Sequence, residues 1–139
     1  MKHLPGRISG RWLGIVALAT LLQACATLAP PANPEDIVRE RAKSRWDARL
    51  AGDLETAYSY ASPAYRSAFD VNAFGEMYGR GLAHWTSAEV RSVTCRETVC
   101  DVVMFITYTT PVQKGRVLSS TLNERWVLED DQWWIYLKV

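Results

Sequence analysis

The sequence has little of what marks an enzyme or a nucleic-acid-binding protein. Its 139 residues include two histidines and three cysteines, and it has neither a G-x-S-x-G motif nor a glycine-rich phosphate-binding loop. Residues 25–139 carry 13 basic and 15 acidic side chains, a net charge of −2. Because nucleic-acid binding requires a basic face, this charge balance disfavours nucleic acid as a partner.

The sequence also lacks a hydrophobic run long enough to span a bilayer. Its longest run, residues 13–24, has about a dozen residues, whereas a spanning helix needs about 20. The run follows a basic lead-in with Lys2, Arg7 and Arg11, and it ends on the small residue Ala24. This order is typical of a secretory signal, the alternative being a buried core helix. We therefore expect residues 1–24 to be a signal peptide.

Residues 22–25, Leu-Gln-Ala-Cys, resemble the lipobox of bacterial lipoproteins. The resemblance implies that the Cys25 thiol receives a diacylglyceryl group, that the chain is cut before Cys25, and that the new amine is acylated. Several acyl chains on one residue give stable membrane attachment. Ala26 in place of Asp implies the outer membrane, with the protein facing the periplasm. Residues 25–33 are then the acylated cysteine and a proline-rich, extended tether.

The remaining residues, 34–139, are expected to form one domain that begins with helices. Asn33 as N-cap and Pro34 in the first turn start a helix that ends at Gly52. Its apolar residues recur at a spacing of four and predict one buried stripe: Val38, Ala42, Trp46 and Leu50. Its basic residues are mixed with acids and indicate a solvated face: Arg39, Arg41, Lys43, Arg45 and Arg49.

Two further helical regions and then strands are expected. Asp53 caps a helix that Ser62–Pro63 interrupts, with a short helical turn over 63–68, and Asp70 begins a third helix. From Trp85 onward the chain is rich in Val, Thr and aromatic residues in four segments, with turns at 114–115 and 130–131. This order predicts an α+β domain, with an antiparallel sheet of about four strands against the helices.

Cys95 and Cys100 flank a predicted four-residue hairpin loop, which places them opposite each other. An exported protein meets an oxidising compartment, so we expect a disulfide between them. Two free buried thiols are the alternative. A metal pair has less support because His84 is the one histidine beyond the signal. We expect neither a metal nor a cofactor.

The candidate site residues are few. His84 is a weak candidate for a general base, although a lone histidine before a strand is more often structural or exposed. Asp101, near the start of a strand, is a weak candidate for an acid facing a cavity. Six aromatic residues could line a pocket, the alternative being that they form core: Trp46, Tyr58, Tyr65, Tyr78, Tyr108 and Trp126.

Three segments resemble the nuclear transport factor 2-like (NTF2-like) superfamily: the helix end AGDLETAYSYASP, the strand WTSAEVRSVTC and the hairpin RWVLEDDQWWI. The resemblance implies a cone made by helices closing one side of a curved sheet, with a pocket inside. We expect an envelope lipoprotein without enzymatic activity that binds an envelope protein or a small apolar ligand. The alternatives are a small isomerase, dehydratase or cyclase acting in the cone, or a structural factor docking through the sheet.

Overall fold

The computed structural model describes residues 33–79 and 81–138. The expected signal peptide, Cys25 and nearly all of the tether therefore lie outside the described residues. Within them, no helix is long and apolar enough to cross a membrane.

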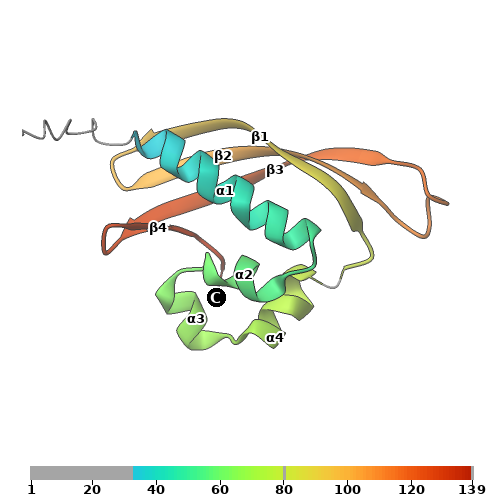
Figure 1. Ribbon diagram of the computed structural model, residues 1–139, viewed down its shortest axis with the longest axis horizontal. Coiled ribbons are helices and arrows are strands. Elements are labelled where there is room, and N and C mark those ends of the chain that lie inside the picture. The colour runs from blue at the N-terminus through green and yellow to red at the C-terminus, as the bar shows by residue number, and fades with distance from the viewer. Residues whose placement is uncertain (1–32, 80, 139) are drawn as a thin grey trace, which may run out of the picture.

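The chain folds as helices followed by one antiparallel sheet, which confirms the predicted α+β class (Figure 1). The helical half contains α1 (Pro34–Leu50), α2 (Leu54–Ser59), α3 (Pro63–Ala68), α4 (Val71–Phe74) and the π-helical turn η1 (Gly75–Gly79). The sheet contains β1 (His84–Arg96), β2 (Val99–Thr109), β3 (Leu118–Glu129) and β4 (Gln132–Ile135). Its strands pair in the order β1-β2-β3-β4.

The predicted N-caps begin the helices because each side-chain oxygen accepts a backbone N–H that the first turn leaves free. The three bonds are Glu35 N to Asn33 at 3.2 Å, Thr56 N to Asp53 at 3.0 Å and Ala73 N to Asp70 at 2.9 Å. The third predicted helix, however, changes to a π-turn at Gly75. Gly79 then passes so close to Leu54 that a Cβ would lie 2.6 Å from Leu54 Cδ2.

Tight turns join the strands. Asp130 and Asp131 both have positive φ, 50° and 58°, as a two-residue type I′ hairpin requires. In the first hairpin Arg96 pairs with Val99, so the loop is Glu97–Thr98, two residues rather than the four predicted. This tighter turn still sets Cys95 opposite Cys100, and the expected disulfide joins them.

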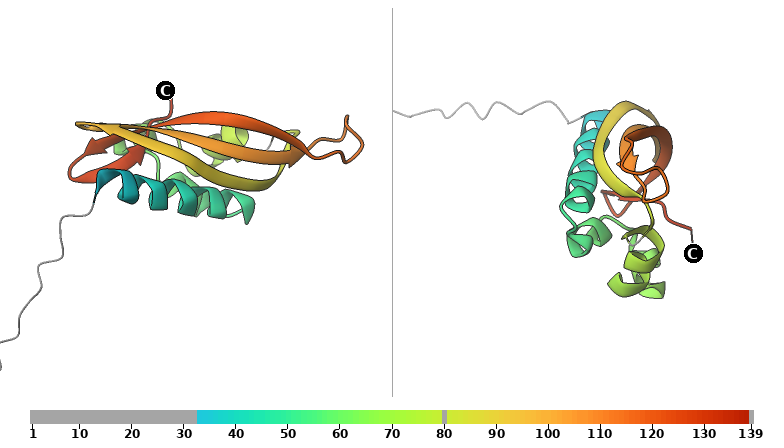
Figure 2. Two further views of the ribbon diagram at one scale, coloured as in Figure 1. Left: turned by 90° about the horizontal axis from the view of Figure 1, so that it is seen from above. Right: turned by 90° about the vertical axis from the view of Figure 1, so that its right-hand side faces the viewer.

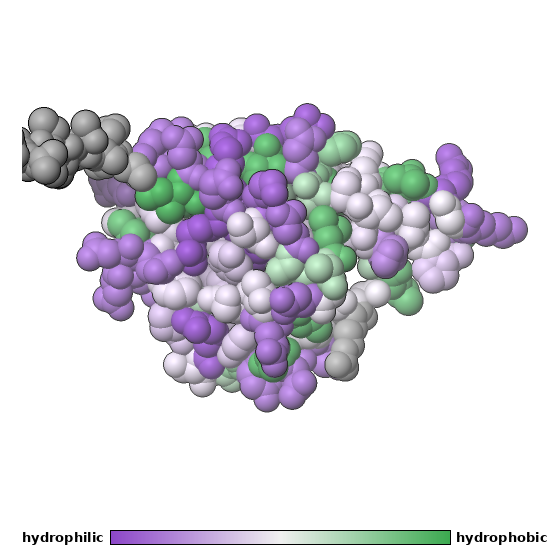
Figure 3. All heavy atoms as spheres, viewed as in Figure 1, coloured by the Kyte–Doolittle hydropathy of each residue, from purple (hydrophilic) through white to green (hydrophobic). Residues whose placement is uncertain are grey.

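The long helix α1 lies against the sheet, and the short helices gather below α1 in the view of Figure 1 and in the end-on view of Figure 2. In the end-on view of Figure 2 the sheet curls strongly, and β1 has register shifts at Trp85/Ser87 and Val90/Ser92 that favour such twisting. The predicted stripe of α1 packs into the core: Val38, Ala42 and Trp46 are fully buried, and Leu50 is half-buried. The outer face that carries α1 is mostly hydrophilic (Figure 3).

Candidate functional site

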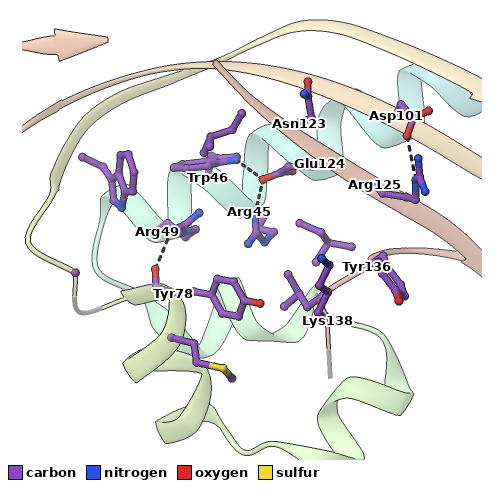
Figure 4. Close-up of a pocket in the computed structure, with 16 residues that line it drawn as sticks. Arg45, Trp46, Arg49, Tyr78, Asp101, Asn123, Glu124, Arg125, Tyr136 and Lys138 are labelled. Carbon is purple, nitrogen blue, oxygen red and sulfur yellow. Dashed lines mark hydrogen bonds and ion pairs between the residues drawn. The ribbon is translucent and has the colours of Figure 1, made fainter. Parts of the chain in front are cut away.

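A cavity of about 610 Å³ lies between the C-terminal half of α1, the middle of β3, η1 and the C-terminal segment 135–138 (Figure 4). Pockets of a few hundred to a thousand Å³ are typical of small-molecule sites. The polar or charged side chains that line it are Arg45, Arg49, Tyr78, Asp101, Asn123, Glu124, Arg125, Tyr136 and Lys138. The apolar side chains that line it are Trp46, Met77, Trp85, Leu122, Ile135 and Leu137.

The C-terminal segment closes one side of the cavity because its backbone is fixed at two points. Ile135 N–H donates to Tyr60 O at 3.0 Å, and Tyr136 N–H donates to Arg125 O at 2.7 Å. These bonds place Leu137 and Lys138 along the cavity wall.

Glu124 of β3 is the centre of the polar wall. Its carboxylate is only 8% exposed and accepts three hydrogen bonds. The donors are Arg45 Nη1 at 2.7 Å, Trp46 Nε1 at 2.7 Å and Trp126 Nε1 at 3.2 Å. Because two of these donors belong to α1 and one to β3, a single carboxylate fixes the helix to the sheet (Figure 4).

Arg45 is the counter-charge of Glu124 and is itself only 2% exposed. A buried ion pair persists when its remaining donors and acceptors are satisfied, and here one is not: Arg45 Nε has no hydrogen-bond partner. Within the described part of the chain, the site therefore holds a buried guanidinium whose Nε–H has no hydrogen-bond partner.

Arg49, one helical turn further along α1, has no such carboxylate. Its Nη2 donates to Tyr78 O at 2.8 Å, and its guanidinium carbon lies 4.1 Å from the centre of the Trp46 ring, a cation–π distance. Trp85 is a second aromatic neighbour at 5.7 Å. Burial, followed by repulsion from Arg45, lowers the pKa of Arg49 to about 10. The side chain therefore keeps its positive charge at neutral pH.

These arginines correct the expectation of a solvated basic face on α1. Lys43 is exposed, but Arg45 is buried and Arg39, Arg41 and Arg49 are half-buried. Arg41 turns toward β4 and donates from Nε to Trp133 O at 2.8 Å. The signal that could have found them is their spacing of four, 41, 45 and 49, which places them on one stripe beside the apolar one.

The six aromatic candidates divide into two groups. Trp46 and Tyr78 line the cavity. The other four are not among its lining residues. Tyr65 and Trp126 are fully buried, Tyr58 donates its hydroxyl to Phe69 O at 2.7 Å, and Tyr108 packs on Trp85 with ring centres 5.5 Å apart.

The two weak acid–base candidates lie far apart. His84 is exposed at the start of β1, where it pairs with Thr109 of β2, and it does not line the cavity. Asp101 does line the cavity, but it is eight residues from Thr109 along β2, roughly 27 Å of extended strand. Asp101 instead pairs with Arg125 and Arg96, each at 3.1 Å. The register does not bring His84 and Asp101 together.

Comparison with known proteins finds solved structures of similar fold. No family model and no curated protein matches the sequence. A SEC-C motif-containing protein from Psychrobacter arcticus is similar at a TM-score of 0.57 and 17% identity, over 91% of this chain and 79% of that one. Another, from Rhodopseudomonas palustris, has a TM-score of 0.53 at 15% identity, over 68% and 70%. At these identities the likeness shows the fold alone.

The structural neighbours also include a protein from Campylobacter jejuni described as an NTF2-like transpeptidase. It has a TM-score of 0.48 at 12% identity, over 71% of this chain and 96% of that one. Because this TM-score is below 0.5, the similarity supports no conclusion about this chain.

Replacing Glu124 should test whether its carboxylate holds the domain together. In Glu124→Gln one oxygen must serve three donors, and Arg45 loses its counter-charge inside the protein. We expect the free energy of unfolding to fall by about 3 kcal/mol, measured by urea titration. Asp47→Asn, which removes the exposed pair with Lys43, is the control and should leave stability nearly unchanged. A Glu124→Gln protein within about 1 kcal/mol of the parent would contradict the assignment.

Proposed function

We propose that the protein is a bacterial envelope lipoprotein whose NTF2-like, cone-shaped domain binds a small ligand in the cavity beside α1. The observation that carries the binding half of this proposal is the cavity itself, because apolar side chains and a few convergent polar groups share its walls. The proposal is one of binding, with the ligand held but not chemically changed.

The walls of the cavity are held in place before any ligand arrives. Glu124 ties α1 to β3 through three hydrogen bonds, and the C-terminal segment is hydrogen-bonded to Tyr60 and Arg125. A site that needs no reordering loses less conformational entropy when it binds its ligand, which favours affinity.

The anchoring half of the proposal rests on residues 1–33. A basic lead-in, a short apolar run and Leu-Gln-Ala-Cys follow one another in the order that lipoprotein signals have. Domain helix α1 begins at Pro34, nine residues after Cys25. Nine extended residues reach about 30 Å at most, so an acylated Cys25 would keep the cavity near the membrane surface, which we propose to be the periplasmic face of the outer membrane.

Cys25→Ser tests the anchor. In the parent protein expressed in a diderm bacterium, we expect radiolabelled palmitate on the mature chain and accumulation of an unprocessed form with globomycin, since processing depends on the lipidated cysteine. Cys25→Ser should abolish both signals. The double variant Cys95→Ser/Cys100→Ser is the control, because it removes the disulfide thiols and should leave acylation intact. Unchanged labelling in Cys25→Ser would refute the anchor.

A cavity-filling variant tests ligand binding. We expect the mature chain carrying Cys25→Ser to bind phenylnaphthylamine or its sulfonate saturably, with enhanced dye fluorescence. The background substitution removes acyl chains that would themselves bind the dye. Leu122→Trp fills the cavity and should weaken binding at least about tenfold, a cost of about 1.4 kcal/mol.

Leu118→Trp is the matched control for this experiment. Leu118 lies four residues earlier on the same face of β3 and does not line the cavity. The Leu118→Trp substitution should leave the dissociation constant for the dye unchanged. Failure of both dyes to bind saturably, or equal binding by the Leu122→Trp and Leu118→Trp proteins, would overturn the binding proposal.

A further inference from the structure

The charges that line the cavity do not balance. Four basic side chains face it, and two acidic ones, Asp101 and Glu124. Glu124 is engaged by Arg45 and two indoles, and Asp101 is engaged by Arg125 and Arg96. Arg49 and Lys138 therefore form no ion pair with a carboxylate within the described part of the chain, and the lining has a formal surplus of two positive charges.

Arg49 differs from Lys138 in its surroundings. Lys138 is exposed, so water solvates its charge, whereas Arg49 lies between aromatic rings that remove much of its water. A charge withdrawn from water is costly unless an opposite charge or hydrogen bonds compensate it. Among the described residues Arg49 makes one hydrogen bond, to Tyr78 O, whereas a guanidinium carries five N–H donors.

The remaining N–H donors of Arg49 are not among the buried polar atoms that lack a partner. Arg45 Nε is among the buried polar atoms that have no partner, whereas no nitrogen of Arg49 is. Since Arg49 lines the cavity, its remaining N–H groups are open to whatever occupies that space (Figure 4). A planar guanidinium matches an acidic head group with two parallel hydrogen bonds.

The space next to Arg49 is apolar. Trp46, Met77, Trp85 and Leu122 all line the same cavity, and Trp46 and Trp85 meet edge to face with ring centres 5.7 Å apart. A ligand that places an acidic group on Arg49 therefore presents the rest of its body to carbon surfaces. The carboxylates of Glu124 and Asp101 in the same walls disfavour a second or third negative charge.

We infer that the ligand is an amphiphile with a single anionic head group, which pairs with Arg49 while its apolar body lies against Trp46 and Trp85. This inference rests on the proposed function, because it names the class of ligand for the same cavity. It assigns Arg49 as the residue that selects an acid over a neutral molecule of the same shape.

Two dyes of the same skeleton test the inference. Anilinonaphthalene sulfonate carries one negative charge, and phenylnaphthylamine carries none. On the mature chain with Cys25→Ser, we expect the sulfonate to bind at least about tenfold more tightly than the neutral dye. Decanoate should displace the bound sulfonate more effectively than decanol, which extends the preference to an acyl carboxylate.

Arg49→Gln should remove the selectivity and leave the cavity. Its affinity for the sulfonate should fall about tenfold, while its affinity for phenylnaphthylamine stays within about twofold of the parent. Arg49→Lys, which keeps the charge, should retain a preference for the sulfonate. Arg116→Gln removes an exposed charge outside the cavity and is the control for general electrostatic attraction, with both affinities unchanged.

The outcomes separate this inference from the proposed function. If neither dye binds saturably, the binding function itself fails and this inference fails with it. If both dyes bind with equal affinity, or if Arg49→Gln weakens both equally while remaining folded, the cavity binds ligands but the assignment of an anionic head group is wrong. Should Arg49→Gln not fold, the comparison of the two dyes on the parent protein decides alone.

Discussion

The domain depends on the buried carboxylate of Glu124. It accepts hydrogen bonds from Arg45, Trp46 and Trp126, and so joins the first helix to the third strand through a single charged group. Two large indoles enter the core with their N–H groups satisfied, which buried tryptophans require. The same contact engages the charge of Arg45, and among the described residues it leaves Arg49 as the nearby cation of α1 that forms no ion pair with a carboxylate.

The features that produce the cavity are therefore linked. The curl of the sheet brings β3 opposite the C-terminal half of α1, and the close approach of Gly79 to Leu54 places η1, with Met77 and Tyr78, at the edge of the space between them. The backbone of Tyr78 then orients Arg49. An apolar cavity with one oriented guanidinium is suited to bind an acid with a carbon body.

Local signals in the sequence predicted much of the fold. Asn33, Asp53 and Asp70 cap helices through bonds that span two or three residues, so a short window contains all the information. Asp130–Asp131 likewise specified its own turn. The site was harder to predict because its contacts join residues that are distant in the sequence. Glu124 is 79 residues from Arg45 and 78 residues from Trp46, and no local pattern shows such a contact. Alternating charges on α1 also indicated a solvated face and concealed the inward stripe of arginines.

The central claim is that a ligand enters the cavity beside Arg49, and the indole N–H resonances of the tryptophans report this directly. In a ¹⁵N-labelled mature chain titrated with anilinonaphthalene sulfonate, the signals of Trp46 and Trp85 should shift saturably, because both rings line the cavity. The signal of Trp134, whose ring lies by Arg41 and Arg66 and outside the lining, should stay in place. Shifts of Trp134 as large as those of Trp85, or no saturable shift of Trp46 and Trp85, would contradict the account.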